Sequence, residues 1–354
     1  MSGLNRLIDA QQSILLAEAG ALLHNLGKVS RQFFEWQSKT GSPKYRYQHI
    51  LQFVASDYPN LSQDFPELAE ALQEPENQGI LKPEIIHLLK ATFFLPPPFE
   101  DHPYRIGELI EYLGQGQNQI GNQLYKEANS SYWIERIFPG GARLLHLLNR
   151  AHDATSGSDK EGSDKQDQNI WAKPQPVDSL FRVTPMGWEE PAPTLTDVDN
   201  LRAQVGKVLA NFLNLPASPF PIQAFASELR RHLASALADT QRPVNDISVW
   251  DMGRTGAAFL KTAAAAYILT GRPMSHDDLS GRGVHNKLFW RVLSCQLNGI
   301  DYLERALSVA EVRTRHRLLT ERLNHLRDTL ENFPLAAEVY RDENGSFYLF
   351  PDIE

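Results

Sequence analysis

The sequence contains a single cysteine, Cys295, and no long apolar run, and both scarcities exclude whole classes of protein. One cysteine cannot build an internal disulfide framework, and such cysteine usage is typical of a reducing cytosol. Residues 1–10 lack the basic region and apolar run of a secretory signal peptide. The longest apolar stretch, around 257–269, is too short and too rich in alanine to span a bilayer. The sequence therefore predicts a soluble, cytoplasmic protein.

Positive charge is also in short supply. The chain has 35 Lys and Arg against 43 Asp and Glu, for a net charge of -8. Such a chain is not a general polyanion binder, so any nucleic acid must meet a local basic patch or be held by partner subunits. The sequence has no P-loop, Rossmann fingerprint, CxxC metal pattern or internal repeat. Its 354 residues, 42% of them hydrophobic, are enough for about two or three units with a buried core.

Hydrophobic periodicity predicts a mainly helical chain. The first three predicted helices cover 10–38, 48–56 and 66–72. A fourth runs from 83 and ends before the prolines at 96–98, and two more cover 106–113 and 141–152. Residues 155–169 lack apolar side chains and predict a flexible loop, and the Pro-rich residues 173–194 predict an extended connector. Further helices are predicted at 197–213, 222–237 and 256–270, followed by a loop at 274–283.

The C-terminal part of the chain has a different pattern. Residues 287–297 predict a strand, and residues 302–332 predict a long amphipathic helix. Strands at 336–340 and 346–350 follow, and the Asn-Gly pair between them is a strong hairpin signal. A strand, a long helix and a hairpin make the first half of a ferredoxin-like β-α-β-β unit. The second helix and fourth strand of that fold have no counterpart in the sequence.

Residues 21–28, Ala-Leu-Leu-His-Asn-Leu-Gly-Lys, resemble the L-L-H-D-I-G-K signature of HD-superfamily phosphohydrolases. In that superfamily the His and Asp hold one or two divalent metals, because an imidazole nitrogen and a bridging carboxylate suit such ions. This chain keeps His24 but carries Asn25, whose amide oxygen has no net charge and bridges two ions poorly. A helix with one polar pair in an apolar face would give the same eight residues.

Further segments resemble, in the same order, the large subunit of type III CRISPR RNA-guided effector complexes. His49 lies where the permuted HD domain of that family places its second histidine, and His87 lies where the family often has a His-His pair. Residues 149–160 are similar to the family's A-D-x-L-A-S-G-x-D-R segment, with Asp153 matched to its aspartate. The resemblance implies a metal site built from His24, Asn25, His49, His87 and Asp153.

Later segments resemble the same family. Residues 177–181 match its L-x-S-I-F segment, and residues 245–258 match D-I-S-L-Y-D-H-S-R-T-T-A-A with Met252 in place of the histidine. The second match also reads as a capped helix start followed by closely packing alanines. Residues 291–303 and 344–351 resemble strands of the family's first palm domain. The Gly-Gly-Asp-Asp motif of its second palm, which makes cyclic oligoadenylates, does not occur in the sequence.

The resemblance implies a mainly α fold in four parts. These are an N-terminal helical HD-type domain (1–160), a flexible and Pro-rich linker (161–195), a helical connector (196–283) and a partial ferredoxin-like α+β palm of β-α-β-β form (284–354). It also implies a ribonucleoprotein of antiviral defence. The implied partners are guide RNA, target RNA, the backbone, guide-5′-end-capping and small subunits, and single-stranded DNA, without a membrane.

Two functions of different classes stay open. A metal-dependent HD nuclease would use manganese, magnesium or nickel at His24 to cut single-stranded DNA, with Lys28 stabilising the charge that develops on the phosphate. A degenerate large subunit would scaffold the complex without cutting. Asn25, Met252 and Gln296, which replace a ligand, a histidine and an acidic residue of the family, favour a weak or inactive site. A stand-alone HD phosphohydrolase for small nucleotides is a third reading, and the palm-like C-terminus argues against it.

The helix predicted at 302–332 is basic. Its positive or titratable residues include Arg313, Arg315, Arg317, Arg322 and His316. Such residues either contact RNA or a partner or form a solvated helix face, and the second is the commoner case.

Overall fold

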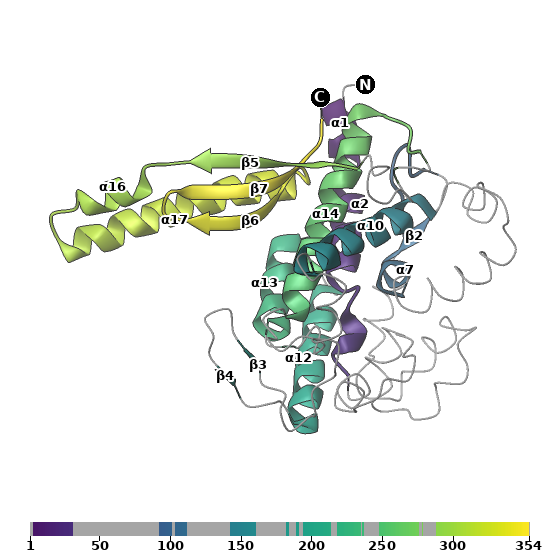
Figure 1. Cartoon of the computed structure of the whole chain (residues 1–354), viewed down its shortest axis with the longest axis horizontal. Coiled ribbons are helices and arrows are strands. Elements are labelled where there is room, and N and C mark those ends of the chain that lie inside the picture. The colour runs from purple at the N-terminus through teal and green to yellow at the C-terminus, as the bar shows by residue number, and fades with distance from the viewer. Residues whose placement is uncertain are drawn as a thin grey trace, which may run out of the picture.

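The computed structural model describes residues 3–30, 92–100, 103–111, 142–160, 182–183, 189–190, 194–213, 218–234, 236, 248–275, 278 and 288–353. Within these ranges the protein is mainly helical and has a small three-stranded antiparallel sheet, which confirms the mainly α class. The sheet and its long helix project from one side of a helical body (Figure 1). None of the described helices is both long and apolar enough to cross a membrane.

The N-terminal helices form the centre of the body. After α1 (Gly3–Asp9), α2 (Gln11–Leu22) is buried on nearly every side, as expected for a helix that is apolar all round. The predicted helix over 10–38 therefore ends early, and a turn leads into the short 3₁₀ helix η1 (Leu26–Lys28). Gly27 lies within η1. The predicted helices at 48–56 and 66–72 lie outside the described residues, as does the part of the next predicted helix that precedes residue 92.

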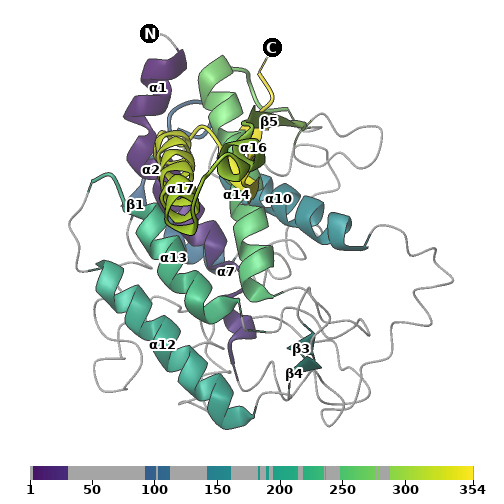
Figure 2. The same cartoon turned by 90° about the vertical axis from the view of Figure 1, so that its left-hand side faces the viewer.

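The longest helix of the body, α14 (Val249–Thr270), packs against α1, α2, α10 (Ala142–Lys160) and α13 (Ile222–Leu233). It begins seven residues before its predicted start at 256, because the side chain of Ser248 and the carboxylate of Asp251 form a capping box. It ends at Gly271, whose φ of 65° is the left-handed cap that glycine adopts without strain. Figure 2 shows α14 beside α2 and α10 from a second direction.

Two glycines let α14 approach the end of α2. A Cβ atom on Gly253 would lie 2.6 Å from the carbonyl oxygen of Leu22, closer than real Cβ contacts allow. A Cβ on Gly256 would lie 3.2 Å from Cε1 of His24. The three-residue spacing places both glycines on one helix face. The match at 245–258 is thus, in the folded protein, the place where two helices nearly touch.

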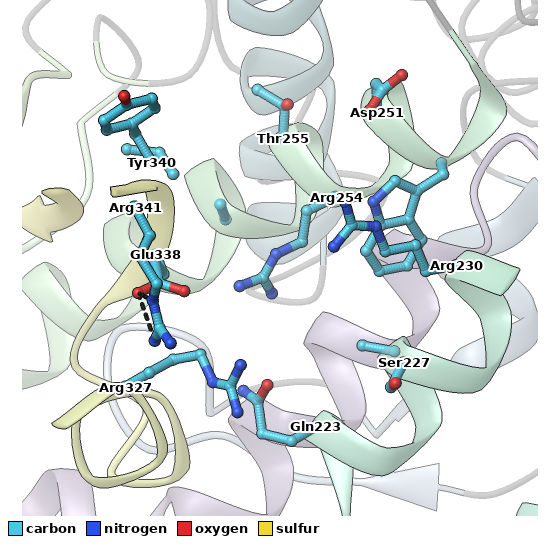
Figure 3. Close-up of a pocket in the computed structure, with 14 residues that line it drawn as sticks. Gln223, Ser227, Arg230, Asp251, Arg254, Thr255, Arg327, Glu338, Tyr340 and Arg341 are labelled. Atoms are coloured by element: carbon cyan, nitrogen blue, oxygen red, sulfur yellow. Dashed lines mark hydrogen bonds and ion pairs between the residues drawn. The ribbon is translucent and has the colours of Figure 1, made fainter. Parts of the chain in front are cut away.

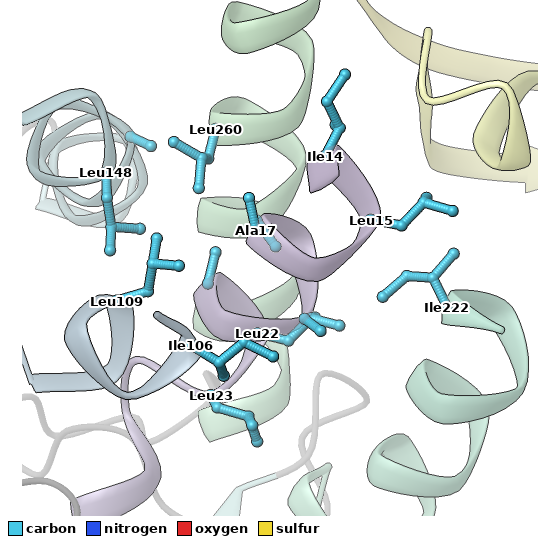
Figure 4. Close-up of a cluster of buried hydrophobic side chains, with 14 of the residues drawn as sticks. Ile14, Leu15, Ala17, Leu22, Leu23, Ile106, Leu109, Leu148, Ile222 and Leu260 are labelled. Atoms are coloured by element: carbon cyan, nitrogen blue, oxygen red, sulfur yellow. The ribbon is translucent and has the colours of Figure 1, made fainter. Parts of the chain in front are cut away.

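One continuous hydrophobic core joins the helices on both sides of the predicted 161–195 linker. Figure 4 shows side chains from α2, α7 (Ile106–Glu111), α10, α13 and α14 meeting in it. They include Ile14, Leu15, Leu22, Leu109, Leu148, Ile222 and Leu260. The helix α12 (Leu195–Leu213), close to its predicted range, packs on α13.

Three local predictions differ from the structure. The loop predicted from 155 is helical up to Lys160, because α10 continues, and the hydroxyl of Thr155 donates to the carbonyl of Ala151 at 2.9 Å. The helix predicted from 83 to the prolines at 96–98 is wrong over its last residues, because β1 (Thr92–Phe93) pairs there with β2 (Tyr104–Arg105) in a short antiparallel ladder. Within the predicted connector, β3 (Arg182–Val183) pairs with β4 (Glu189–Glu190).

The C-terminal strands form the predicted β-α-β-β unit. The elements are β5 (Trp290–Gln296), α16 (Gly299–Glu304), α17 (Val309–Asn332), β6 (Ala337–Asp342) and β7 (Gly345–Pro351). The strand order is β5-β7-β6 with antiparallel neighbours, so β5 and β6 are parallel and β7 lies between them, a split β-α-β arrangement. The hairpin lies where the Asn-Gly pair predicts it, but Asp342 pairs with Gly345, so the two turn residues are Glu343 and Asn344. The predicted helix over 302–332 is divided, and Ser308 caps its second part.

Helix α17 packs on one face of the sheet, whereas α14 meets the sheet only near its base, and Val292 of β5 is 64% exposed. Arg341 of β6 donates to the side chain of Asn324 at 2.6 Å and to the carbonyl of Leu323 at 2.9 Å, so α17 lies on its face. On the other face, Trp290 packs edge-on against Phe259 of α14, and its indole donates to the Phe259 carbonyl at 3.1 Å. These contacts fix the sheet to the helical body at its base.

Candidate functional site

His24 lies in the turn between α2 and η1, and two partners orient its ring. Nδ1 is 2.5 Å from the carbonyl oxygen of Ala21, which can only accept, so Nδ1 carries the proton. Nε2 is then the acceptor nitrogen, and the side-chain amide of Asn25 donates to it at 2.8 Å. A backbone carbonyl that holds one ring nitrogen while the other faces inward is usual for a metal-ligating histidine.

His152 of α10 is the residue that meets His24. Its Nδ1 lies 3.1 Å from Nε2 of His24, and the two rings pack edge to face with centroids 5.2 Å apart. Asp153, matched to the family's aspartate, has a side chain that is 53% exposed and pairs with Arg150 on its own helix. Adjacent residues on an α-helix point about 100° apart, so the helix face that presents His152 to His24 turns Asp153 away.

Lys28 and Met252 lie beside the histidine pair. Nζ of Lys28 is 3.7 Å from Sδ of Met252. Lys28, predicted to stabilise charge on a phosphate, therefore reaches from η1 to α14. Burial lowers the pKa of His24 to about 4, with the hydrogen bond to Ala21 opposing and the Lys28 charge adding to the decrease. His24 is therefore neutral at physiological pH.

The described residues of this site do not fit a divalent metal. His24 and His152 offer two ring nitrogens, Asn25 offers a neutral amide, and the charge that acts on His24 is the cation of Lys28. Metals of this kind are held by three or more ligands, and the hard ones need carboxylates. No cluster of three metal-ligating side chains forms among the residues that the structure describes. His49 and His87 lie outside them, so their part in the site stays a prediction.

A second polar cluster lies buried where the sheet unit joins the helical body. Glu18 of α2 accepts from Lys261 at 2.9 Å and from Arg254 at 3.1 Å, both on α14. Arg254 also donates to Glu331 of α17 at 2.5 Å. Glu331 accepts in turn from the backbone N–H of Glu338 in β6 at 2.7 Å. We call Glu18, Lys261, Arg254 and Glu331 the junction cluster.

The junction cluster balances two cations against two carboxylates. Burial raises the pKa of Glu18, while Lys261 and Arg254 act in the opposite direction. Burial also acts on Glu331, but Arg254 and Lys261 outweigh it and hold the pKa of that carboxyl below its usual value. Burial opposes the charge of Arg254, yet Glu331 and Glu18 raise the pKa of its guanidinium. The match at 245–258 thus supplies Arg254 as a structural tie between α2 and α17.

Sequence reasoning missed both His152 and the junction cluster. An ungapped alignment of residues 151–160 with A-D-x-L-A-S-G-x-D-R places His152, not Asp153, at the family's aspartate. That alignment would have identified the residue that faces His24. No local signal predicts the junction cluster, because the ion pair between Lys261 and Glu18 joins positions 243 residues apart.

Fold and site together define a mainly helical protein with a split β-α-β sheet and a buried histidine, His24, that contacts the half-buried His152. Comparisons with protein-family models, with curated proteins and with solved structures each found no match. The function is therefore argued from the residues themselves.

Proposed function

We propose that this chain is the large-subunit component of a type III CRISPR RNA-guided ribonucleoprotein, with a degenerate HD site and mainly a scaffolding role. One observation carries the proposal. The segments 21–28, 149–160 and 245–258, each similar to that family in sequence, meet in space at His24. Segments that resemble a family by chance would have no reason to converge on the one histidine that its signature requires.

The C-terminal sheet supports the same assignment. The order β5-β7-β6 is that expected for the first half of a ferredoxin-like unit, which the resemblance to a palm domain implies for residues 284–354. The buried junction cluster makes this unit continuous with the helical body. A large subunit that organises its neighbours needs such a fixed arrangement.

The scaffold role is favoured over cutting by the charge of the site. Asn25 stands in place of the signature aspartate, and the ungapped alignment puts His152 in place of the second aspartate. A site that has lost both carboxylates cannot offset the charge of two divalent ions or bridge them. The alternative is an active nuclease for single-stranded DNA, and the orientation of His24 and the presence of Lys28 favour it.

The role of the site can be tested by restoring its carboxylates. In the assembled complex with target RNA, we expect no cutting of single-stranded DNA by the natural protein. The double variant Asn25→Asp/His152→Asp should gain manganese-dependent cutting, and His24→Ala in that background should remove it. Metal-dependent cutting by the natural protein that His24→Ala abolishes would establish the alternative instead.

The identity of the complex needs a separate experiment. The tagged chain, purified from its native cells, should bring down CRISPR effector subunits and short guide RNAs whose ends derive from CRISPR repeats. An unrelated tagged protein from the same cells is the control. Recovery of the chain alone, or with RNA that does not derive from CRISPR repeats, would overturn the proposed function.

A further inference from the structure

A pocket of about 650 Å³ opens between α13, α14, α17 and β6, where the sheet unit joins the helical body (Figure 3). Its lining includes Arg230, Arg254, Arg327 and Arg341, one arginine from each of these four elements. Its volume lies in the range of about 300–1,000 Å³ that is common for ligand sites. Four guanidinium groups around one cavity are unexpected in a chain of net charge -8.

Two of these arginines are neutralised within the protein. Arg254 belongs to the junction cluster, and Arg341 pairs with Glu338 at 2.8 Å. The other carboxylate of the lining, Asp251, accepts from the hydroxyl of Ser248 at 2.7 Å and from its backbone N–H at 3.0 Å. The acidic groups of the pocket are therefore already engaged.

The other two arginines keep donors for a ligand. Among the described residues, the ion-pair partner of Arg327 is Asp328, its half-exposed neighbour in the chain, and such surface pairs are weak. Arg230 is exposed and makes no ion pair among the residues that the structure describes. Figure 3 shows Arg254 and Arg327 extending toward the same space. The pocket thus presents available positive charge on α13 and α17, at its two sides.

The positive charge continues along α17, outside the pocket. By helix geometry, Arg313 lies within about 40° of Arg327 around the helix axis and about 21 Å along it. Arg313 is exposed and makes no ion pair within the described part of the chain. A track of this length exceeds what a small anion needs and suits an extended polyanion.

We propose that this pocket and track bind single-stranded RNA, with phosphates at Arg230, Arg327 and Arg313. Guanidinium groups bind phosphate oxygens in pairs. Trp250 and Tyr340, which also line the pocket, offer aromatic faces for bases, the usual partners of unpaired nucleotides. An acidic peptide would use the arginines but not these faces. The choice of RNA over DNA rests on the proposed function.

The test is fluorescence anisotropy of the full chain with a labelled oligouridylate of about ten nucleotides at about 50 mM salt. Arg230→Gln and Arg313→Gln should each weaken binding about tenfold, the effect of one lost charge-assisted hydrogen bond. Each should also lower the slope of log K against log salt by about 0.7. Two matched controls remove an arginine outside the proposed site. Arg231→Gln lies next to Arg230 on α13, and Arg322→Gln lies about 140° from Arg327 around α17. Both should leave the affinity for the oligouridylate unchanged.

The inference would be overturned by an absence of binding at low salt, by equal loss of affinity in the controls and the pocket variants, or by equal competition by polyglutamate. Equal affinity for the matching deoxyoligonucleotide would remove the assignment to RNA. Crosslinking of thiouridine RNA should label peptides of α13, α14 or β6, and labelling only elsewhere would also count against the pocket. If RNA crosslinks to the pocket but CRISPR subunits do not co-purify with the chain, the proposed function is wrong and the RNA-binding pocket is still supported.

Discussion

At the scale of single residues, His24 is defined by its surroundings more than by its signature. The carbonyl of Ala21 fixes the tautomer, Asn25 occupies the acceptor nitrogen, and His152 takes the place expected of a carboxylate. The carbonyl and the amide carry no charge. Both ring nitrogens of His24 thus have hydrogen-bonding neighbours within the protein, so the buried ring is satisfied without an ion.

The lowered pKa of His24 predicts how stability depends on pH. In the unfolded chain His24 is protonated near its ordinary pKa of 6.5, whereas in the folded protein it is protonated only near pH 4. The neutral state of His24 therefore contributes about 3 kcal/mol to the free energy of unfolding above pH 6.5. This contribution is lost as the pH falls from 6.5 to 4. Urea unfolding in the presence of a chelator, at pH 7 and at pH 4, measures it.

The matched variants separate this effect from other titrating groups. His24→Gln should flatten the change between the two pH values by about 3 kcal/mol. His316→Gln alters an exposed histidine of α17 and should leave the change as it is. Equal pH dependence in the natural protein and in His24→Gln would contradict the buried, neutral state of His24.

At the scale of elements, the approach of α14 to the end of α2 decides where the site forms. The capping box at Ser248 starts α14 early enough for Gly253 and Gly256 to face Leu22 and His24. A helix begun at 256, as periodicity predicts, would not reach that contact. The glycines matter here for the space they leave and not for unusual backbone angles.

Substitution of the two glycines should give a rank order. Gly253→Ala places a Cβ against the backbone oxygen of Leu22 and should destabilise by about 1–3 kcal/mol, despite the better helix propensity of alanine. Gly256→Ala places a Cβ 3.2 Å from the His24 ring and at an ordinary 3.8 Å from Oγ1 of Thr155, and a gain in propensity of about 1 kcal/mol should nearly offset the crowding. Urea unfolding of both variants checks this order, and equal stabilisation of both would refute the close contact.

At the scale of the whole molecule, the junction cluster makes one structure of the helical body and the sheet. Its members come from α2, α14 and α17, and its charges balance only when all three helices are in place. Its ion pairs are largely shielded from solvent, so they lose little to screening by salt. The sheet unit should therefore unfold together with the body.

Removing one cation of the cluster should expose this coupling. Lys261→Met leaves Glu18 buried beside a single cation and should lower the free energy of unfolding by about 3–5 kcal/mol. The control Lys207→Met alters an exposed lysine of α12 and should change it by no more than about 0.5 kcal/mol. A natural protein that unfolds in two separate transitions, with the sheet melting apart from the body, would contradict the single structure.

The sequence by itself determined the elements whose signals are local. The position of the C-terminal hairpin, the strand–helix–hairpin order and the centres of most helices that the structure describes follow from turn chemistry and hydrophobic periodicity, which act between near neighbours. The HD-like segment at 21–28 likewise pointed to His24 without any coordinates. These features depend only on residues a few positions apart.

Only the tertiary structure decided which side chains meet. His24 and His152 are 128 positions apart in the sequence. Which residue of α10 faces His24 depends on the rotation of that helix, because the neighbours His152 and Asp153 point about 100° apart. The junction cluster depends on α2, α14 and α17 packing together, and single charged residues in a sequence do not reveal their partners. Burial and ion pairing are properties of packed surfaces, so they emerge only when distant elements are brought into contact.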